Sequence, residues 1–342
     1  MEDRNMIVET IKVFNRSSAQ SAKDQQKHKE GHEYLSIIMH AGSQSSSNNN
    51  SENPIAFEIV SNKPHICHQI EYLMRNKLNN ILVVVERKYA SKMESTIKQG
   101  ISVNTNDLEL EIVALQDEEE SANVLSLLQD KIDRDFIVMN GETLTDLSLD
   151  TFINVHQTTE NSASILLKDV NFSIKQKGNY DIFGLSSWTE KRFEDSTPSK
   201  RLVFKATNIE SENMDLTIRP SLLRRCNNLK IRTDVSSVGV YLFKYWILKL
   251  VCDIEEDHDI SILSIEDDLL PFLAKHQFKQ KLHKYIQKSV HESRFDIGDE
   301  DIQEKFDLIM NPSKKVSKDL IKIGVYIEKN QLQSKQGHQQ TK

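Results

Sequence analysis

A strand-like run is followed at once by a loop in the position of a phosphate-binding loop, but this loop holds only one glycine. The apolar run is Leu35 to Met39, and the loop reads HAGSQSSSNNN from His40 to Asn50. A phosphate cradle uses several glycines, because without a Cβ the backbone N–H groups can close around the anion. Gly42 alone does not supply such a cradle. We therefore expect the strand and loop of a nucleotide-phosphate site, but a loop that lacks the residues needed to bind phosphate.

Two acidic stretches are candidate metal sites, and neither has the pattern of one. Asp117 to Glu120 precedes a helical pattern, and negative charge suits the start of a helix. His258 lies in the acidic stretch Asp253 to Asp259, without a second histidine at ligand spacing. We interpret the first stretch as a helix start and the second as a solvated loop. The order of residues also supports no Ser-His-Asp or Cys-His triad.

Composition excludes several classes of protein. The chain has 342 residues, with 44 basic and 51 acidic side chains and a net charge of −7, so we expect no direct nucleic-acid partner. Three widely spaced cysteines indicate neither a disulfide framework nor a metal knuckle. We see no apolar segment of a signal peptide and no run of the roughly 18 apolar residues that a membrane span requires. The prediction is a cytosolic protein without a membrane partner.

The order of apolar patterns predicts an α/β fold, with a mostly parallel sheet and helices on both faces. Strand-like runs alternate with helical spacing at Ile81 to Val85, Leu108 to Leu115, Phe136 to Met139 and Ala163 to Leu167. Pro64 suits a first helical position, and the apolar stripe after it predicts a helix. Two runs, Tyr180 to Trp188 and Lys200 to Thr207, predict an antiparallel hairpin added to the sheet. Ile265 to Leu273 predicts a helix that Pro271 kinks or ends.

The same patterns suggest a division of the chain into four parts. Residues 1–33 are predicted to be a flexible N-terminal tail, and the main domain is predicted to span residues 34–278. A helical linker and a terminal strand follow in 279–330, and 331–342 form a polar tail. No hexapeptide repeat of a left-handed β-helix is detected in the sequence.

Four tracts together resemble the nucleotidyltransferase-like domain of the gamma subunit of eukaryotic translation initiation factor 2B, which is related to sugar-phosphate nucleotidyltransferases. They are Tyr34 to Val85, Phe136 to Leu167, Lys230 to Leu250 and Ser261 to Phe278. A weaker fifth tract, Lys318 to Asn330, is similar to the segment that leads into a left-handed β-helix in this family. The resemblance implies a Rossmann-like nucleotidyltransferase fold.

The resemblance also implies which residues stand at the positions of the active relatives' site. The loop arginine of those relatives falls near Ser46, and their Pro-Lys-Pro motif falls at Pro54-Ile55-Ala56. Their first metal-binding acid matches Glu142, and the second matches Ser237. Fixed positive charge would be needed to stabilise a triphosphate and its pyrophosphate leaving group. Glu142 as a residue of a strand-end turn and Asp146 as a helix cap are the alternative interpretations for the nearby acids.

We therefore predict no catalytic residue, no cofactor site and no metal ligand. The resemblance implies a non-catalytic subunit that pairs with the epsilon subunit and the other subunits of initiation factor 2B, and supports guanine-nucleotide exchange on initiation factor 2. The alternative is an active sugar-1-phosphate nucleotidyltransferase that recruits another cation, such as Lys63 or Arg75. A third interpretation is an epsilon subunit or a shortened paralogue. The adjacent arginines Arg224 and Arg225 are either a contact for a partner or ordinary surface residues.

Overall fold

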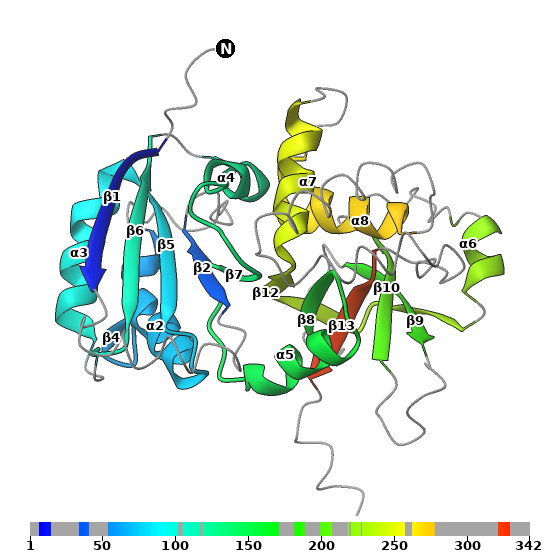
Figure 1. Ribbon diagram of the computed structural model, residues 1–342. Helices are drawn as coiled ribbons and strands as arrows, with labels where there is room; N and C mark the ends of the chain where they lie inside the picture. The colour runs from blue at the N-terminus through cyan, green and yellow to red at the C-terminus, as the bar shows by residue number, and fades with distance from the viewer. Residues whose placement is uncertain are drawn as a thin grey trace, which may run out of the picture.

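The computed structural model is built around one large twisted sheet with helices packed on it (Figure 1). It describes residues 7–14, 34–40, 54–101, 105–116, 119–170, 181–188, 199–206, 218, 220–226, 228–256, 262–277 and 321–328. In these ranges the helices are η1 (Ile55–Phe57), α2 (His65–Arg75), α3 (Arg87–Gly100), α4 (Ser121–Leu127), α5 (Leu149–Thr158), α6 (Pro220–Arg225), α7 (Tyr245–Glu256), η3 (Ile265–Leu269) and α8 (Leu270–His276). None of the helices in these ranges has the length and apolarity needed to cross a bilayer.

The strands of the described part form an eleven-stranded sheet and a small hairpin. The sheet runs in the order β1-β6-β5-β2-β7-β12-β8-β13-β10-β9-β11. The strands are β1 (Ile7–Phe14), β2 (Leu35–Met39), β3 (Ile59–Val60), β4 (Lys63–Pro64), β5 (Asn80–Glu86), β6 (Glu109–Leu115), β7 (Phe136–Asn140), β8 (Ala163–Asp169), β9 (Ile182–Trp188), β10 (Ser199–Ala206), β11 (Leu229–Arg232), β12 (Val235–Phe243) and β13 (Ile323–Glu328). β3 and β4 make the separate hairpin.

The parallel part of the sheet lies where the sequence predicts it. β6, β5, β2 and β7 run parallel, and β13 runs parallel to β8. β12 is antiparallel to both of its neighbours, and β9 pairs antiparallel with β10 as the predicted hairpin. The α/β fold with its antiparallel addition is therefore confirmed.

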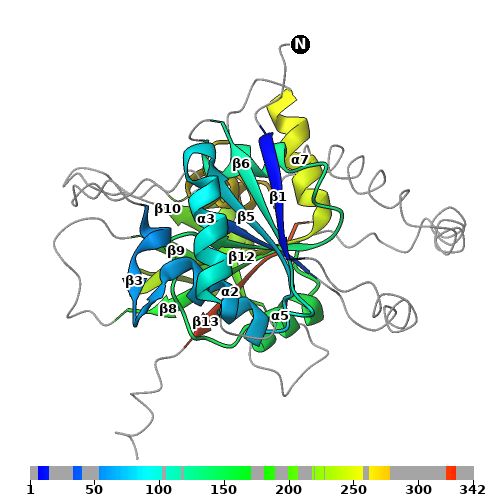
Figure 2. The same ribbon diagram turned by 90° about the vertical axis from the view of Figure 1, so that its left-hand side faces the viewer.

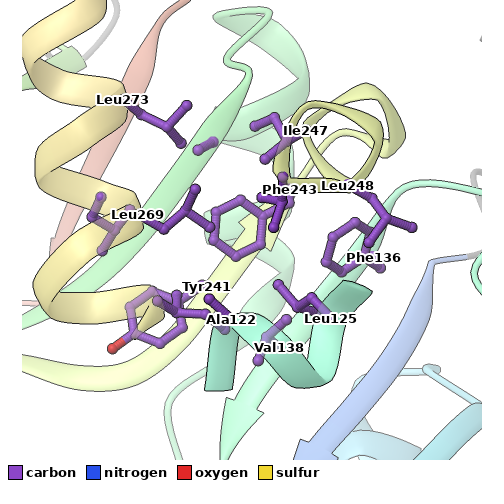
Figure 3. Packing of buried hydrophobic residues seen from close by; sticks show 14 of the residues in the cluster. Ala122, Leu125, Phe136, Val138, Tyr241, Phe243, Ile247, Leu248, Leu269 and Leu273 are labelled. Carbon is purple, nitrogen blue, oxygen red and sulfur yellow. The ribbon is translucent and has the colours of Figure 1, made fainter. Parts of the chain in front are cut away.

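Helices cover both faces of the sheet, as predicted, and each face has its own apolar core. One core joins α2, α3 and α5 to the sheet through side chains such as Ile70, Ile97 and Phe152. The other lies under α4, α7, η3 and α8 (Figure 3). There, Phe136 of β7 and Phe243 of β12 pack with ring centroids 5.6 Å apart. Strands buried on both faces explain the continuous apolar runs that mark them in the sequence.

The N-terminal part of the fold differs from the prediction. Residues 7–14 form β1, which pairs antiparallel with β6 at the edge of the sheet, so the expectation that the fold begins near Tyr34 is wrong for this segment. Glu9, Thr10 and Lys12 are exposed there, because an edge strand meets solvent. Because of this mixed polarity, the sequence of the segment does not show the continuous apolar run that predicts the buried strands. Residues 15–33, predicted as a tail, lie outside the described residues.

The terminal strand is part of the main sheet. The sequence predicts a strand at Ile321 to Ile327, and β13 confirms it. Its predicted place beyond a domain boundary at residue 278 is wrong, because β13 lies between β8 and β10 and is paired on both sides. Arg201 of β10 is buried, and its guanidinium donates to the carbonyl of Ile321 at 2.8 Å. The predicted linker helices and the tail 331–342 lie outside the described residues.

Two prolines sit slightly differently from the prediction. Pro64 is the N-cap residue of α2, one position before the first helical residue His65. Pro271 lies in the first turn of α8, and the predicted helix from Ile265 is split into the π-helix η3 and α8. Proline is tolerated in a first turn because that N–H has no partner within the helix. The boundary between the two helices thus falls between Leu269 and Leu270, just before Pro271.

Candidate functional site

The candidate site lies at the carboxyl ends of two adjacent parallel strands, where ligands of open α/β sheets bind. Met39 of β2 and Asn140 of β7 are paired in register at this edge. The loop after β2 begins at His40, and its residues 41–53 lie outside the described residues. The predictions for Gly42 and Ser46 therefore stay predictions. The loop after β7 is described in full.

Gln69 of α2 holds the loop after β7 in place. Its side chain is fully buried, and Nε2 donates toward the carbonyl oxygens of Asn140, Gly141 and Thr143 at 3.1, 3.1 and 2.8 Å. Its Oε1 lies 3.1 Å from Nε2 of His40. One carboxamide thus connects α2, the end of β2 and the turn after β7. Because buried polar atoms are costly when unpaired, this contact fixes the turn strongly.

Two glycines allow the backbone to approach this turn closely. The N–H of Gly141 donates to the carbonyl of Met39 at 2.7 Å, and a Cβ on Gly141 would lie 2.5 Å from that oxygen. Gly239 in β12 has a φ of +79°, and a Cβ there would lie 2.5 Å from Oγ1 of Thr143. Thr143 also donates to the carbonyl of Val238 at 2.8 Å. The turn is therefore held from α2, β2 and β12.

The two histidines beside the turn supply little positive charge at neutral pH. Burial, together with a smaller effect of repulsion from His65, lowers the pKa of His40 to about 4. Burial also lowers the pKa of His65, with repulsion from His68 in the same direction. A histidine with a depressed pKa is neutral near pH 7. These imidazoles are hence no replacement for the cations that the predicted site lacks.

Glu142 lies at the tip of the turn, and its side chain is exposed. Its N–H donates to Oδ1 of Asn140 at 3.2 Å, so Glu142 is part of the turn that follows β7. Desolvation raises the pKa of its carboxyl group. In the part of the chain that the structure describes, no group of three or more acidic, histidine or cysteine side chains could hold a metal ion. Glu142 alone would make a poor Mg²⁺ site, since Mg²⁺ favours near-octahedral oxygen ligands.

Asp146 is not the cap of the following helix. The N-cap residue of α5 is Ser148, which makes no side-chain cap bond. Instead, Oδ1 of Asn76, at the end of α2, accepts from the N–H of Leu149 at 2.9 Å. Asp146 is exposed. The proposed cap role of Asp146 is therefore wrong, because Asn76, which is distant in sequence, accepts the hydrogen bond at the start of α5 instead.

Lys63 and Arg75, the two possible substitute cations, are poorly placed to bind phosphate. Nζ of Lys63 is 2.7 Å from Oε1 of Glu71, a residue with 7% side-chain exposure, so its charge is already balanced. Arg75 is the last residue of α2 and is exposed. At about 1.5 Å per residue, it lies roughly 15 Å along the helix from His65, which is at the site end.

Ser237, at the position of the second metal-binding acid, belongs to a polar network that sequence reasoning missed. Its Oγ lies 3.3 Å from Oη of Tyr241, which donates to Oε2 of Glu266 at 2.6 Å. The buried ammonium of Lys205 lies 2.9 Å from Oε1 of Glu266 and 3.4 Å from Oδ1 of Asp267. Burial and Glu266 raise the pKa of Tyr241. The network joins β10, β12 and η3 and has no sequence motif.

The remaining predicted features lie away from this edge or outside the described ranges. Glu120 is the N-cap residue of α4, as the interpretation of the acidic run requires, whereas residues 117 and 118 are not described. His258 also lies outside the described residues. Arg224 is an exposed residue of α6, which lies on the same side of the molecule as β9 (Figure 1).

Part of the chain, including the strand-end turn, is similar to a known family of enzymes. Residues 49–175 match the family of nucleotidyl transferases. This range includes α2 with Gln69, the turn after β7 with Glu142, and the parallel strands β5, β6 and β7. The structure of HddC from Yersinia pseudotuberculosis, complexed with GMP-PN, is 18% identical, with a TM-score of 0.43 over 70% of this chain and 85% of that one.

The chain is also similar to two curated proteins that share one name. The chain is 28% identical over 232 residues to translation initiation factor eIF2B subunit gamma of Dictyostelium discoideum, covering 64% of this chain and 51% of the relative. It is 22% identical over 231 residues to the subunit of the same name from Schizosaccharomyces pombe, covering 66% and 47%. These matches confirm the resemblance predicted from the four tracts. The chain spans about half the length of these relatives.

Proposed function

We propose that this chain is a non-catalytic subunit of an eIF2B complex, which pairs with the epsilon subunit and supports guanine-nucleotide exchange on initiation factor 2. The observation that carries the proposal is the similarity to eIF2B gamma subunits over 232 residues. We also propose that the protein works in the cytosol, as a translation factor does. Its contribution is to assembly, and the exchange reaction belongs to the complex.

The chemistry at the strand-end turn supports a subunit without nucleotidyl transfer activity. Transfer from a nucleoside triphosphate needs fixed positive charge or a metal ion where pyrophosphate departs. The titratable side chains described above at this edge are one exposed carboxylate, Glu142, and two histidines, His40 and His65, whose pKa values are depressed. Lys63 is balanced by Glu71. The sequence places serine and isoleucine at the two cation positions, Ser46 and Ile55.

Two experiments test the proposal separately. Affinity purification of the tagged chain from its own cells, followed by mass spectrometry, is expected to recover the epsilon subunit and other eIF2B subunits. Their absence would count heavily against assembly. In a pyrophosphate-release assay with each nucleoside triphosphate and a panel of sugar 1-phosphates, we expect no product above the protein-free control. Turnover that Glu142→Ala abolishes would refute the non-catalytic assignment.

The second candidate function is an active sugar-1-phosphate nucleotidyltransferase. The match of residues 49–175 to the nucleotidyl transferase family favours it, together with the retained turn that presents Glu142. In this case Lys63 would leave Glu71 and bind phosphate. A single-turnover pyrophosphate assay comparing wild type with Lys63→Ala distinguishes the two functions, because only the enzyme loses product on this change.

A further inference from the structure

The part of the chain that forms α6 and β11 differs in charge from the rest of the protein. Residues 218–232, which include both elements, contain five lysines and arginines and no aspartate or glutamate, whereas the whole chain has a net charge of −7. β11 is the outermost strand of the described sheet, next to β9. α6 lies on the same side of the molecule as β9 (Figure 1). The proposed function makes no use of this basic segment.

Two of the basic side chains are available to a partner. Arg224 of α6 and Lys230 of β11 are both exposed, and within the described part of the chain neither forms an ion pair. Arg232 differs from them, because its guanidinium lies 2.8 Å from Oδ1 of Asp169 and also pairs with Asp234. The charge of Arg232 is therefore balanced within the fold. Arg224 and Lys230 are the cations of this segment that remain open to an acidic ligand.

Apolar side chains are exposed on the same two elements. Leu223 of α6 and Ile231 of β11 are each 50% exposed, and both are adjacent in sequence to one of the two cations. Successive side chains of a strand point to opposite faces, so Ile231 and Lys230 lie on different faces of β11. A segment that runs along the edge of β11 would therefore meet an apolar side chain on one face and an ammonium on the other.

The outer edge of β11 has no strand beside it in the described part of the sheet. β11 pairs antiparallel with β9 from Leu229 to Arg232, and the strand order ends at β11. The backbone N–H and C=O groups at such an edge can pair with an extended segment of another chain. A second copy of β11 is a poor candidate, because like charges on paired strands are destabilising. An acidic segment has the complementary charge.

We propose that β11 and α6 bind an extended acidic segment of a partner protein. The segment adds to β11 as a further strand, with an apolar side chain beside Ile231 and carboxylates facing Lys230 and Arg224. In this mode of recognition the backbone hydrogen bonds supply affinity and the alternating side chains supply specificity. RNA is less well matched, because phosphate binding gains nothing from Ile231 or from the carbonyl groups of a strand edge. The inference does not depend on the proposed eIF2B function, since it assigns a different surface.

A peptide selection tests this proposal on the full chain. Random dodecapeptides displayed on phage are selected on the wild type after depletion on the double variant Arg224→Glu/Lys230→Glu, and the best peptides are measured by fluorescence anisotropy. The single variants are Lys230→Glu and Ile231→Asp, with Ile231→Thr as a milder change that keeps a β-branched residue in the strand. Matched controls are Arg87→Glu and Ile59→Asp, which change exposed residues of α3 and β3. α3 packs beside β1, at the end of the sheet that faces the viewer in Figure 2.

We expect selected peptides in which acidic and apolar residues alternate. Lys230→Glu and Ile231→Asp should each weaken binding by about tenfold, and Ile231→Thr by less, whereas the two controls should leave it unchanged. N-methylation of one of the two sets of alternate amides in the best peptide should abolish binding, because these amides pair with β11. Thermal unfolding of every variant shows whether it is folded.

Several results would overturn the proposal. They are the enrichment of no peptide over the double variant, the enrichment of basic peptides, and full binding by peptides N-methylated in either set of amides. Tighter binding of a random-sequence RNA than of any peptide, lost in Lys230→Glu, would assign the surface to nucleic acid instead. Light scattering that shows a dimer of the wild type and a monomer of Ile231→Asp would assign it to a second copy. Recovery of eIF2B subunits in the purification experiment is independent of each result.

Discussion

The substitution Gln69→Glu replaces the amide nitrogen of a buried side chain by oxygen, and it should strongly destabilise the protein. In the wild type, Nε2 of Gln69 faces the carbonyl oxygens of Asn140, Gly141 and Thr143 at 3.1, 3.1 and 2.8 Å. The substitution places a carboxyl group of the same shape against these three acceptors. When ionised, this group has no hydrogen to donate, and it repels the carbonyl dipoles. The packing volume barely changes, so the effect isolates the hydrogen bonds.

The magnitude follows from the two protonation states of the new carboxyl group. Protonated, it donates one hydrogen where the amide donates two, which costs about 2 kcal/mol for the carbonyl left unpaired. Ionised, it is a buried charge beside the neutral imidazole of His40, with no cation to balance it among the contacts of Gln69, which adds about 3 kcal/mol. The expected loss of unfolding free energy is therefore about 5 kcal/mol at pH 8. This is a large fraction of the roughly 5–15 kcal/mol that stabilises most proteins.

The pH dependence has a definite sign. Burial raises the folded-state pKa of the new carboxyl group above its unfolded value of about 4.3. Protonation therefore stabilises the folded variant, and its deficit relative to wild type should shrink as pH falls from 8 to 5. Urea unfolding followed by circular dichroism at both pH values measures this, with the exposed residue Gln99 changed to Glu as control. A loss below 1 kcal/mol at pH 8, or a larger deficit at pH 5, would refute the reasoning.

Three other predictions follow from the same structure. A chain ending at Leu320 lacks β13, which separates β8 from β10, and should lose cooperative unfolding by circular dichroism, whereas a chain ending at Asn330 should not. Lys205→Met leaves Glu266 and Asp267 without their buried ammonium and should cost about 3 kcal/mol in urea unfolding, against almost nothing for exposed Lys230→Met. The folded-state pKa of His40 is about 4, below its ordinary value, so its protonation opposes folding as pH falls below about 6.5. His40→Asn should therefore reduce the acid loss of stability between pH 6 and 4, by about 1.4 kcal/mol per pH unit at most.

The parallel centre of the sheet could be predicted because its burial leaves a strong pattern. Ile81 to Val85 are all buried, so the sequence there is continuously apolar. β1 lacks this pattern, because its exposed residues alternate with partly buried ones at the sheet edge. The position of β13 was beyond prediction for another reason. Its neighbours β8 and β10 are more than 100 residues away in sequence, and no local pattern specifies such a pairing.

The strand-end turn was partly predictable from particular residues. Gln69 falls on the same helical stripe as Ile66, Ile70 and Leu73, and a polar residue in an apolar stripe is a signal of a buried hydrogen-bond role. That signal was available in the sequence. The network of Lys205 and Glu266 has no such signal in the sequence, because the two residues look like ordinary surface charges until the fold brings them together. The lowered pKa values of His40 and His65 likewise depend on burial, which sequence alone does not give.

Binding of nucleotide tests the central claim most directly. Isothermal titration calorimetry of the purified chain with GTP, ATP and UTP, each with Mg²⁺, is run beside the variant Glu142→Ala. The account predicts no saturable heat up to millimolar nucleotide and identical traces for both proteins. Saturable binding of any nucleotide that Glu142→Ala removes would show that the strand-end turn still holds a triphosphate, and it would contradict a role confined to assembly.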